Sequence, residues 1–493
     1  MIFFLDELVS EGAAGWPDNI AVIEAETGNS ITYKELAKSV EALSAQILRK
    51  GLKKGQRVGI LSPNSILFIC VYFAISRAGG IAVPFNHTLD SLDIAREAKD
   101  CGLSAIYAGK PLKEKAEAIR EEVRSIRFII EDEKKALQTE RRVRPKGTDP
   151  VSIIYTSGTT RRPLGVMLSH RNLISNNTSI VKYLSLTADD KILSVLPFYY
   201  IYGLSLLFSH FLAGGTVIID NRFMYPSVVL DTINKYRATG FAGVSSHYAI
   251  LLYKTDFNKR KFPTLRYLMQ AGDRMPSHLT KKLTETFSDK KLYIAYGQTE
   301  ASPRMTYLNP DLVKVKPNSI GRAIPDVKIK VVNIDGKECN VGRKGEIIAR
   351  GENVMLGYWN NKKETSKTIK KGWLYTGDMA YRDRDGDLFI VGRRKNFIKT
   401  GAHRVNPLEI EDVVIENNNI MEAAVVGAGD DILGKRLKLF VLLVPGKKIS
   451  PNEIIKFCKN RLPPYKVPSE VVILQSMPKN SFGKIDKKEL RIR

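Results

Sequence analysis

Short apolar segments alternate with segments of helical periodicity through the larger, N-terminal part of this chain. Residues 57–61, 81–84 and 192–196 are apolar runs of the length of buried strands, whereas residues 31–50 and 65–78 carry apolar side chains at helical spacing and end near glycine. This rhythm predicts an α/β fold with parallel, doubly wound sheets. Because ligands bind at the carboxyl ends of the strands in such sheets, the loops that follow the strands are the first candidates for a site.

The hydrophobic pattern of the sequence changes from about residue 325. Short alternating strands separated by turns predict a small β-rich subdomain, and the segment after residue 394 mixes strands with helices near 407–416 and 452–461. We therefore predict a large N-terminal domain over 1–394 and a small, mobile α+β C-terminal domain over 395–493.

Charge, cysteine content and apolar segments indicate which partners and which cellular location to expect. The 493 residues carry a formal net charge of +25, which attracts polyanions, but the basic residues are scattered as on a lysine-rich solvated surface. No nucleic-acid-binding module matches, so we expect no nucleic-acid partner. The 4 cysteines show no paired spacing, and the most apolar window, residues 66–75, is too short to span a bilayer. We expect a cytoplasmic protein without a signal peptide or transmembrane segment.

One apolar run ends in an unusual loop. Residues 151–155 are followed by five small residues, and Arg161 and Arg162 come directly after them. The small residues are Thr156, Ser157, Gly158, Thr159 and Thr160. Glycine lets a ligand approach the backbone, and hydroxyls with N–H groups suit a polyanion such as a phosphate chain. A Ser/Thr-rich surface turn is the alternative.

Two further strands end in polar or glycine-rich loops. Residues 265–270 lead into Gly272, Asp273 and Arg274, and residues 292–295 lead into the string from Tyr296 to Glu300. Carboxyl ends of parallel strands share one edge of a sheet, so we expect these loops and the loop after residue 155 to face one cleft.

Four strings taken with that loop resemble the adenylate-forming superfamily of acyl-CoA synthetases, adenylation domains and luciferases. They are YGQTEAS (296–302), YTGDMAYRDRDGDLFIVGRRKNFIK (375–399), GAHRVNPLEIED (401–412) and PKNSFGKIDKKEL (478–490). ITYKEL, LPFYYIYGL and GEIIARGENVMLGYW extend the resemblance over nearly the whole chain.

The resemblance implies that a carboxylic acid reacts with ATP to give an acyl adenylate and pyrophosphate. The loop from Thr156 to Thr160 would hold the phosphates, with Thr156 also counted as catalytic, and Glu300 would bind Mg²⁺. Tyr296 would stack on adenine, and Asp378 and Arg393 would hold the ribose. The remaining implied nucleotide contacts are Gly272, Asp273, Arg274, Gly297, Gln298 and Thr299.

Lys484 is the residue that we expect to contribute most to adenylate formation. Its ammonium would approach the α-phosphate and the carboxylate together and offset their repulsion. The resemblance then implies a rotation of the small domain about a hinge at Lys395, which brings Lys399 to the cleft. There the thiol of coenzyme A, or of a carrier protein's pantetheine arm, would attack the adenylate. Ordinary surface charge is the alternative for Lys395 and Lys399.

The acid pocket is predicted between residues 198 and 300. The candidate lining residues are Tyr199, Tyr200, Ser245, His247 and Gly272. No aspartate occupies residues 197–203, where relatives that activate amino acids usually place one. We therefore favour an acyl or aryl acid over an α-amino acid, although core packing is an equal alternative for the aromatic side chains.

Some positions depart from the superfamily pattern. Arg161 replaces a glycine and Leu164 a lysine of the phosphate loop, Tyr200 replaces a histidine, and Ala402 replaces a glycine beside the thiol channel. An enzyme that passes its acyl group to a carrier protein or an amine is thus an open alternative, as is a catalytically silent scaffold. Intact Asp378, Glu300 and Lys484 argue against the scaffold. A homodimer is left open.

Overall fold

The computed structural model describes residues 2–130, 143, 145–156, 163–394, 396–401, 403–430, 434–480 and 484–492. Within these ranges, no helix combines the length and hydropathy needed to cross a bilayer.

The first sheet has seven strands, five of them parallel. Its order is β18 (Gly357–Tyr358), β8 (Leu164–Ser169), β7 (Pro150–Thr156), β4 (Ile81–Pro84), β3 (Arg57–Leu61), β5 (Ala105–Ala108) and β6 (Phe128–Ile130). The strands from β7 to β6 are parallel, whereas β8 turns back on β7 and β18 on β8. The parallel core confirms the prediction, and the antiparallel edge was not predicted.

The second sheet has nine strands and carries most of the site. Its order is β15 (Arg322–Ala323), β14 (Arg304–Leu308), β13 (Lys291–Gly297), β12 (Tyr267–Gln270), β11 (Gly240–Gly243), β9 (Lys191–Ser194), β10 (Thr216–Ile219), β1 (Ile20–Glu24) and β2 (Ser30–Thr32). The strands from β13 to β1 are parallel, so the loops after β12 and β13 lie side by side, as predicted. β14, β15 and β2 are antiparallel.

Helices lie between the two sheets and on their outer faces. The helices α3 (Ile66–Arg77) and α7 (Ile201–Ala213) are apolar nearly all round, and one core cluster joins them to strands of both sheets. The same cluster takes in α1 (Glu7–Gly15), α2 (Tyr33–Arg49) and α6 (His170–Leu184). The outer face of the first sheet carries α4 (Ser91–Cys101) and α5 (Lys113–Glu122). That of the second carries α8 (Pro226–Lys235), α9 (Ser245–Lys254) and α10 (Ser277–Thr286).

A third sheet forms the predicted β-rich subdomain. Its order is β16 (Lys328–Val332), β17 (Gly345–Arg350), β20 (Trp373–Arg382) and β19 (Ile369–Lys370), and β21 (Leu388–Arg393) also pairs with β20. The helix α11 (Lys362–Thr368) precedes β19. Single 3₁₀ turns are η1 (Lys110–Leu112), η2 (Phe257–Lys259), η3 (Thr299–Ala301), η4 (Pro310–Leu312) and η5 (Pro464–Lys466).

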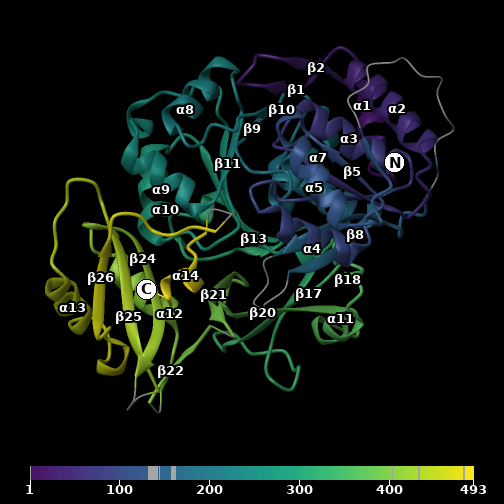
Figure 1. Ribbon diagram of the computed structural model, residues 1–493. Helices are drawn as coiled ribbons and strands as arrows, with labels where there is room; N and C mark the ends of the chain where they lie inside the picture. Colours follow the sequence, from purple (N-terminus) through teal and green to yellow (C-terminus); the bar gives the residue numbers. More distant parts are fainter. Residues whose placement is uncertain are drawn as a thin grey trace.

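The C-terminal segment folds around its own sheet, beside α9 and α10 (Figure 1). The sheet contains β24 (Ile420–Asp430), β25 (Gly434–Leu443) and β26 (Glu470–Leu474), packed against α12 (Pro407–Ile415) and α13 (Pro451–Lys459). The hairpin of β22 (Ile398–Thr400) and β23 (His403–Val405) precedes it, and α14 (Lys487–Leu490) follows. The alternating apolar residues of β24 and β25 give this segment a core of its own. Lys395 lies outside the described residues, so a domain boundary and hinge there stay predictions.

Candidate active site

Three predicted nucleotide residues meet where the second and third sheets approach each other. Tyr296, near the end of β13, donates its hydroxyl to Asp378 Oδ2 at 2.7 Å, and Arg393 Nε donates to Asp378 Oδ1 at 2.7 Å. Asp378 and Arg393 are paired across β20 and β21. The Asp378 carboxylate raises the pKa of Arg393, and burial raises that of Tyr296. The result is a fixed, charged acceptor suited to a pair of ribose hydroxyls.

Glu300, the predicted metal ligand, lies in η3 next to the first sheet. Its Oε1 accepts a hydrogen bond from the Tyr358 hydroxyl at 2.8 Å, and its carbonyl accepts from the backbone of Met355. Sequence reasoning did not assign a role to Tyr358, although the string that ends in GYW contains it. Since β18 pairs with β8 and β8 with β7, this contact ties the end of β13 to the strand that carries Thr156.

The phosphate loop itself is described only at its start. Thr156 ends β7 and donates its hydroxyl to the Leu164 carbonyl at 3.4 Å. Ser157, Gly158, Thr159, Thr160 and the arginines that follow lie outside the described residues, so their predicted contacts with phosphate stay predictions.

The loop after β12 carries Gly272 and Asp273, two of the predicted nucleotide contacts. Gly272 has φ +99°, and a Cβ built on it would lie 3.1 Å from Val244 and 3.9 Å from Lys484 Cε, so only glycine leaves this space open. The Asp273 carboxylate faces inward and accepts from the backbone and the hydroxyl of Ser245, at 3.1 and 2.6 Å. In this structure Asp273 therefore holds the start of α9.

Lys484 lies near Tyr200 and the loop after β12, both in the large domain. Its Nζ lies 6.0 Å from the centre of the Tyr200 ring, and its Cε lies close to Gly272. A turn fixes the backbone of Lys484. Its backbone N–H donates to Asn480 Oδ1 at 3.1 Å, and its carbonyl accepts from the Asn480 N–H at 2.8 Å. Lys399, by contrast, is exposed on β22 at the outer end of the small domain (Figure 1). The structure thus brings Lys484, and not Lys399, to the predicted cleft.

Ion pairs join the small domain to the large one in this arrangement. Arg274, after β12, pairs with Asp412 of α12, and Lys344 lies 3.8 Å from Glu409 of the same helix. Burial raises the pKa of the Asp412 carboxyl, while the charge of Arg274 works against that rise. Arg274 was predicted to line the nucleotide; here its side chain is engaged by the small domain.

Aromatic rings surround several residues of the predicted acid pocket. The His247 ring packs on Phe223 with centroids 4.1 Å apart, and its buried Nδ1 has no hydrogen-bond partner among the described residues. Burial, aided by the charge of Lys479, lowers the pKa of His247 to about 4, so this ring is neutral at physiological pH. Tyr199 is mostly buried against His87, and burial raises its pKa to about 12. Sequence reasoning missed Arg304, which lies behind Tyr202.

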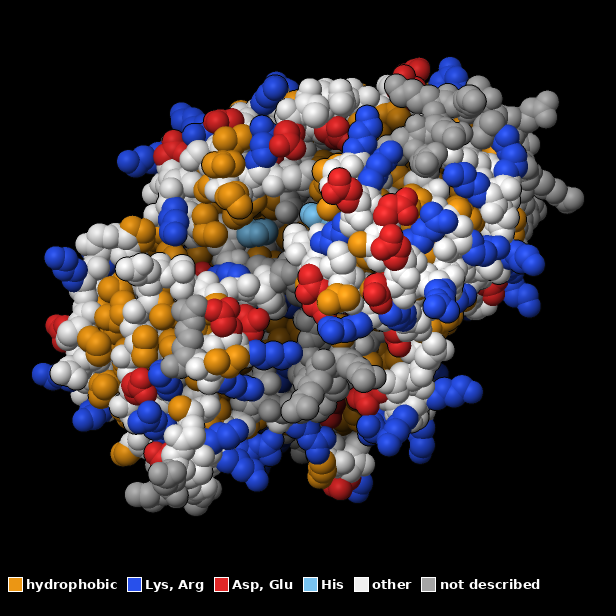
Figure 2. All heavy atoms as spheres, viewed as in Figure 1, with side chains coloured by type: hydrophobic (Ala, Val, Ile, Leu, Met, Phe, Trp, Pro, Cys, Tyr) orange, Lys and Arg blue, Asp and Glu red, His pale blue; other side chains and the backbone are white. Residues whose placement is uncertain are grey.

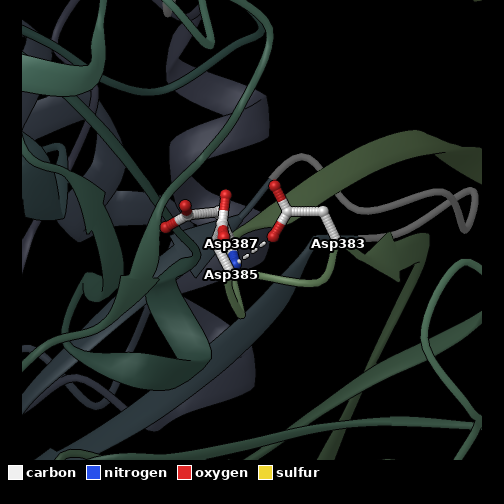
Figure 3. A group of neighbouring side chains, drawn as sticks. All are labelled: Asp383, Asp385 and Asp387. Atoms are coloured by element: carbon white, nitrogen blue, oxygen red, sulfur yellow. Dashed lines mark hydrogen bonds between the residues drawn. The ribbon is translucent and has the colours of Figure 1, made fainter.

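One acidic cluster lies away from the cleft, in the turn between β20 and β21 (Figure 3). Asp383, Asp385 and Asp387 converge there, and the Lys316 ammonium lies 2.7, 2.7 and 2.6 Å from their oxygens. The three carboxylates raise the pKa of Lys316. Because the ammonium occupies the position between the carboxylates, the cluster clamps the segment after η4 to the third sheet.

Basic side chains are spread over the face seen in Figure 2 and interspersed with acidic ones. This distribution agrees with the scattered lysines of the sequence.

Two family models match the chain over most of its length. Residues 9–359 match the model described as AMP-binding enzyme, and residues 409–484 match the AMP-binding enzyme C-terminal domain.

Curated relatives and solved structures cover the same extent. A putative acyl-CoA synthetase of Bacillus subtilis is 30% identical over 99% of this chain and 96% of its own length. The 2-succinylbenzoate–CoA ligase of Bacillus cereus is 32% identical over 96% and 95%. ATP-bound MatB of Rhodopseudomonas palustris superposes with a TM-score of 0.91 at 26% identity, covering 100% of this chain and 99% of that one. The predicted superfamily resemblance and the predicted two-part fold are confirmed.

Proposed function

Because the chain belongs to the AMP-binding enzyme family, we propose that it activates a carboxylic acid with ATP and transfers the acyl group to the thiol of coenzyme A. The observation that carries the proposal is the position of Lys484. Its Cε lies 3.9 Å from a Cβ built on Gly272, and its Nζ lies 6.0 Å from the centre of the Tyr200 ring, two residues predicted to line the site.

The first step joins two anions. A carboxylate oxygen attacks the α-phosphorus of ATP, the bond to the bridging oxygen breaks, and pyrophosphate leaves with that electron pair. Alignment and charge neutralisation, rather than a protein nucleophile, lower such a barrier. Lys484 supplies the positive charge at the meeting point, and Asp378 with Arg393 fixes the sugar.

Glu300 is the proposed metal ligand. Its carboxylate fits a hard cation, because Tyr358 orients one oxygen and η3 holds the backbone at the end of β13. Mg²⁺ bound there would neutralise phosphate charge. Thr156 and the loop that follows it are proposed to hold the same phosphates.

The second step forms the thioester. The thiol attacks the acyl carbonyl, the acyl–phosphate bond breaks, and AMP leaves. We propose that the small domain rotates near Lys395, withdraws Lys484 and presents the face around Lys399. Coenzyme A as acceptor, Mg²⁺ as metal and a cytoplasmic location are parts of this proposal.

The proposal is tested by following pyrophosphate release from ATP and Mg²⁺ with a panel of acids, with and without coenzyme A. We expect multiple turnovers only when coenzyme A is present, with AMP and acyl-CoA formed in equal amounts. Adenylate that accumulates and reacts only with amines or a carrier protein would contradict the acceptor. Absence of pyrophosphate release with every acid would contradict the activity itself.

A further inference from the structure

Two ion pairs join the small domain to the large one within the described ranges, and they differ in burial. Arg274, in the loop after β12, pairs with Asp412 of α12, and these side chains are 22% and 41% exposed. Lys344 and Glu409 lie 3.8 Å apart, and their side chains are 61% and 36% exposed. Removing one partner costs more in a partly buried pair than in an exposed one, so the pair of Arg274 and Asp412 is the stronger candidate for a functional contact.

The guanidinium of Arg274 depends on Asp412 for an anionic partner. No other ion pair of Arg274 is found among the described residues, and its buried Nε has no hydrogen-bond partner there. An arginine keeps its charge in a protein, so loss of the carboxylate would leave a partly buried cation without an anion. Burial raises the pKa of Asp412, and the charge of Arg274 opposes that rise, which agrees with a direct contact between the two groups.

The loop that carries Arg274 is anchored to the second sheet. The Gln270 side chain, at the end of β12, donates to the Asp273 carbonyl at 2.7 Å. The Asp273 carboxylate accepts from the backbone N–H of Ser245, the first residue of α9, at 3.1 Å. A group that binds this loop is therefore held in a defined position relative to the second sheet.

The small domain contacts this loop at two points. Asp412 pairs with Arg274, and Lys484 Cε lies 3.9 Å from a Cβ built on Gly272, two residues earlier in the loop. A rotation that withdraws Lys484 from Gly272 would therefore also pull Asp412 away from Arg274, provided that the two contacting segments of the small domain move together.

Contacts inside the small domain tie these two segments to each other. Glu411, the residue before Asp412, accepts a hydrogen bond through its Oε1 from Lys487 Nζ at 2.5 Å. The same oxygen accepts from the backbone N–H of Val425, in β24, at 2.7 Å. Lys487 begins α14, three residues after Lys484. The position of α12 is thus coupled to that of Lys484.

We propose that the ion pair of Arg274 and Asp412 positions the small domain for adenylate formation, and that this pair breaks before the thioester forms. This inference rests on the proposed function. With the pair intact, Lys484 is held beside the loop after β12. When the small domain rotates, Asp412 leaves with α12 and Arg274 stays with the second sheet. Asp412 is thus a positioning residue, because it acts on the reaction through the location of Lys484.

The first test separates the two steps, using the acid of the panel that releases most pyrophosphate. Asp412→Asn should slow single-turnover pyrophosphate release about 10-fold, because the neutral amide no longer pairs with Arg274. Formation of acyl-CoA from supplied acyl adenylate should not slow, because that step uses the rotated arrangement. A variant that slows both steps equally would have lost structure rather than positioning, and would overturn the inference.

The matched control for this test is Glu416→Gln. It removes a carboxylate at the end of the same helix, and the partner of that carboxylate, Arg461 at 3.9 Å, also belongs to the small domain. Glu416→Gln should change neither step. Slowing of pyrophosphate release as large as in Asp412→Asn would overturn the inference, because any loss of charge near α12 would then have the same effect.

A double-mutant cycle tests whether the two residues act as a pair. Arg274→Met combined with Asp412→Asn should release pyrophosphate no more slowly than the slower single variant, because both changes remove one interaction. The comparison holds even if Arg274→Met also weakens nucleotide binding, since that loss is present in both the single and the double variant. Effects that multiply would show independent residues and would overturn the inference.

A further measurement needs no substrate. In the full chain without ligand, backbone hydrogen exchange over residues 270–276 should be faster in Asp412→Asn than in the unmodified protein or in Glu416→Gln, because the loop loses a contact that covers it. Equal exchange in all three proteins would overturn the inference, whatever their activity. Failure of every acid to release pyrophosphate would instead refute the proposed function, a result distinct from unchanged exchange.

Discussion

The predicted nucleotide side and the predicted acid side of the site differ in how their polar groups are paired. On the predicted nucleotide side, Asp378 contacts Arg393 and Tyr296, and Glu300 contacts Tyr358. On the predicted acid side, His247 is buried in its neutral form, and its Nδ1 has no hydrogen-bond partner among the described residues.

We relate this difference to two tasks of the proposed function: binding ATP, which the family shares, and recognising a particular acid. The hydrogen bonds among Tyr296, Asp378 and Arg393 form without a ligand, so on the proposed function this geometry is set before ATP binds. The predicted acid side instead presents aromatic rings and a neutral histidine, so we expect the shape and polarity of the acid to decide what binds there. The predictions below probe this contrast, from the largest expected effect to the smallest.

Lys484→Ala should lower the rate of pyrophosphate release by at least about 100-fold, roughly 3 kcal/mol of barrier, because two anions would then meet without a neighbouring cation. The measurement is single-turnover pyrophosphate release at saturating ATP and acid. Lys488→Ala, a change of an exposed lysine of α14, is the matched control. A Lys484→Ala protein that still forms adenylate at near-normal rate would remove this residue from the mechanism.

Asp378→Asn should raise the KM for ATP by about 30-fold, close to 2 kcal/mol, because the ribose acceptor loses its charge and Arg393 loses its partner. Steady-state kinetics with ATP as the varied substrate measures this. Asp335→Asn, in an exposed turn of the third sheet, should change nothing. An unchanged KM in Asp378→Asn would show that the paired corner does not bind nucleotide.

Acid should destabilise the fold through buried histidines. Burial lowers the pKa of His210 to about 4, and its ring nitrogens contact the Leu206 carbonyl and the Tyr267 hydroxyl. Between about pH 6.5 and 4 the unfolded chain binds a proton that the native chain excludes, so stability falls as pH falls through this window. His210→Gln should remove on the order of 2 kcal/mol of that loss, measured by urea unfolding at pH 7 and pH 4.5. An unaltered pH dependence would contradict the burial.

Tyr358→Phe should weaken Mg²⁺ dependence about fivefold, close to 1 kcal/mol, because Glu300 would lose the hydroxyl that orients it. The readout is the Mg²⁺ concentration at half-maximal pyrophosphate release. Tyr381→Phe, whose ring stacks on Phe389, is the control. Equal Mg²⁺ dependence in both variants would separate Tyr358 from the metal site.

Some contacts of the site follow from local patterns in the sequence, and others do not. Strand periodicity and the short strings around Tyr296 and Asp378 are local patterns, and the structure brings these two residues into contact. The antiparallel return of β14 depends on tertiary pairing and was not predicted. Because β14 turns back into the core, Arg304 is buried at a position where a charged residue would be expected at the surface.

The central claim is tested most directly by acyl-adenylate formation in the full chain, with ATP, Mg²⁺ and a panel of carboxylic acids, detected by mass spectrometry and pyrophosphate release. We predict an adenylate with at least one acid of the panel, strongly reduced in Lys484→Ala. A protein that forms adenylate equally well without the Lys484 ammonium would contradict this account.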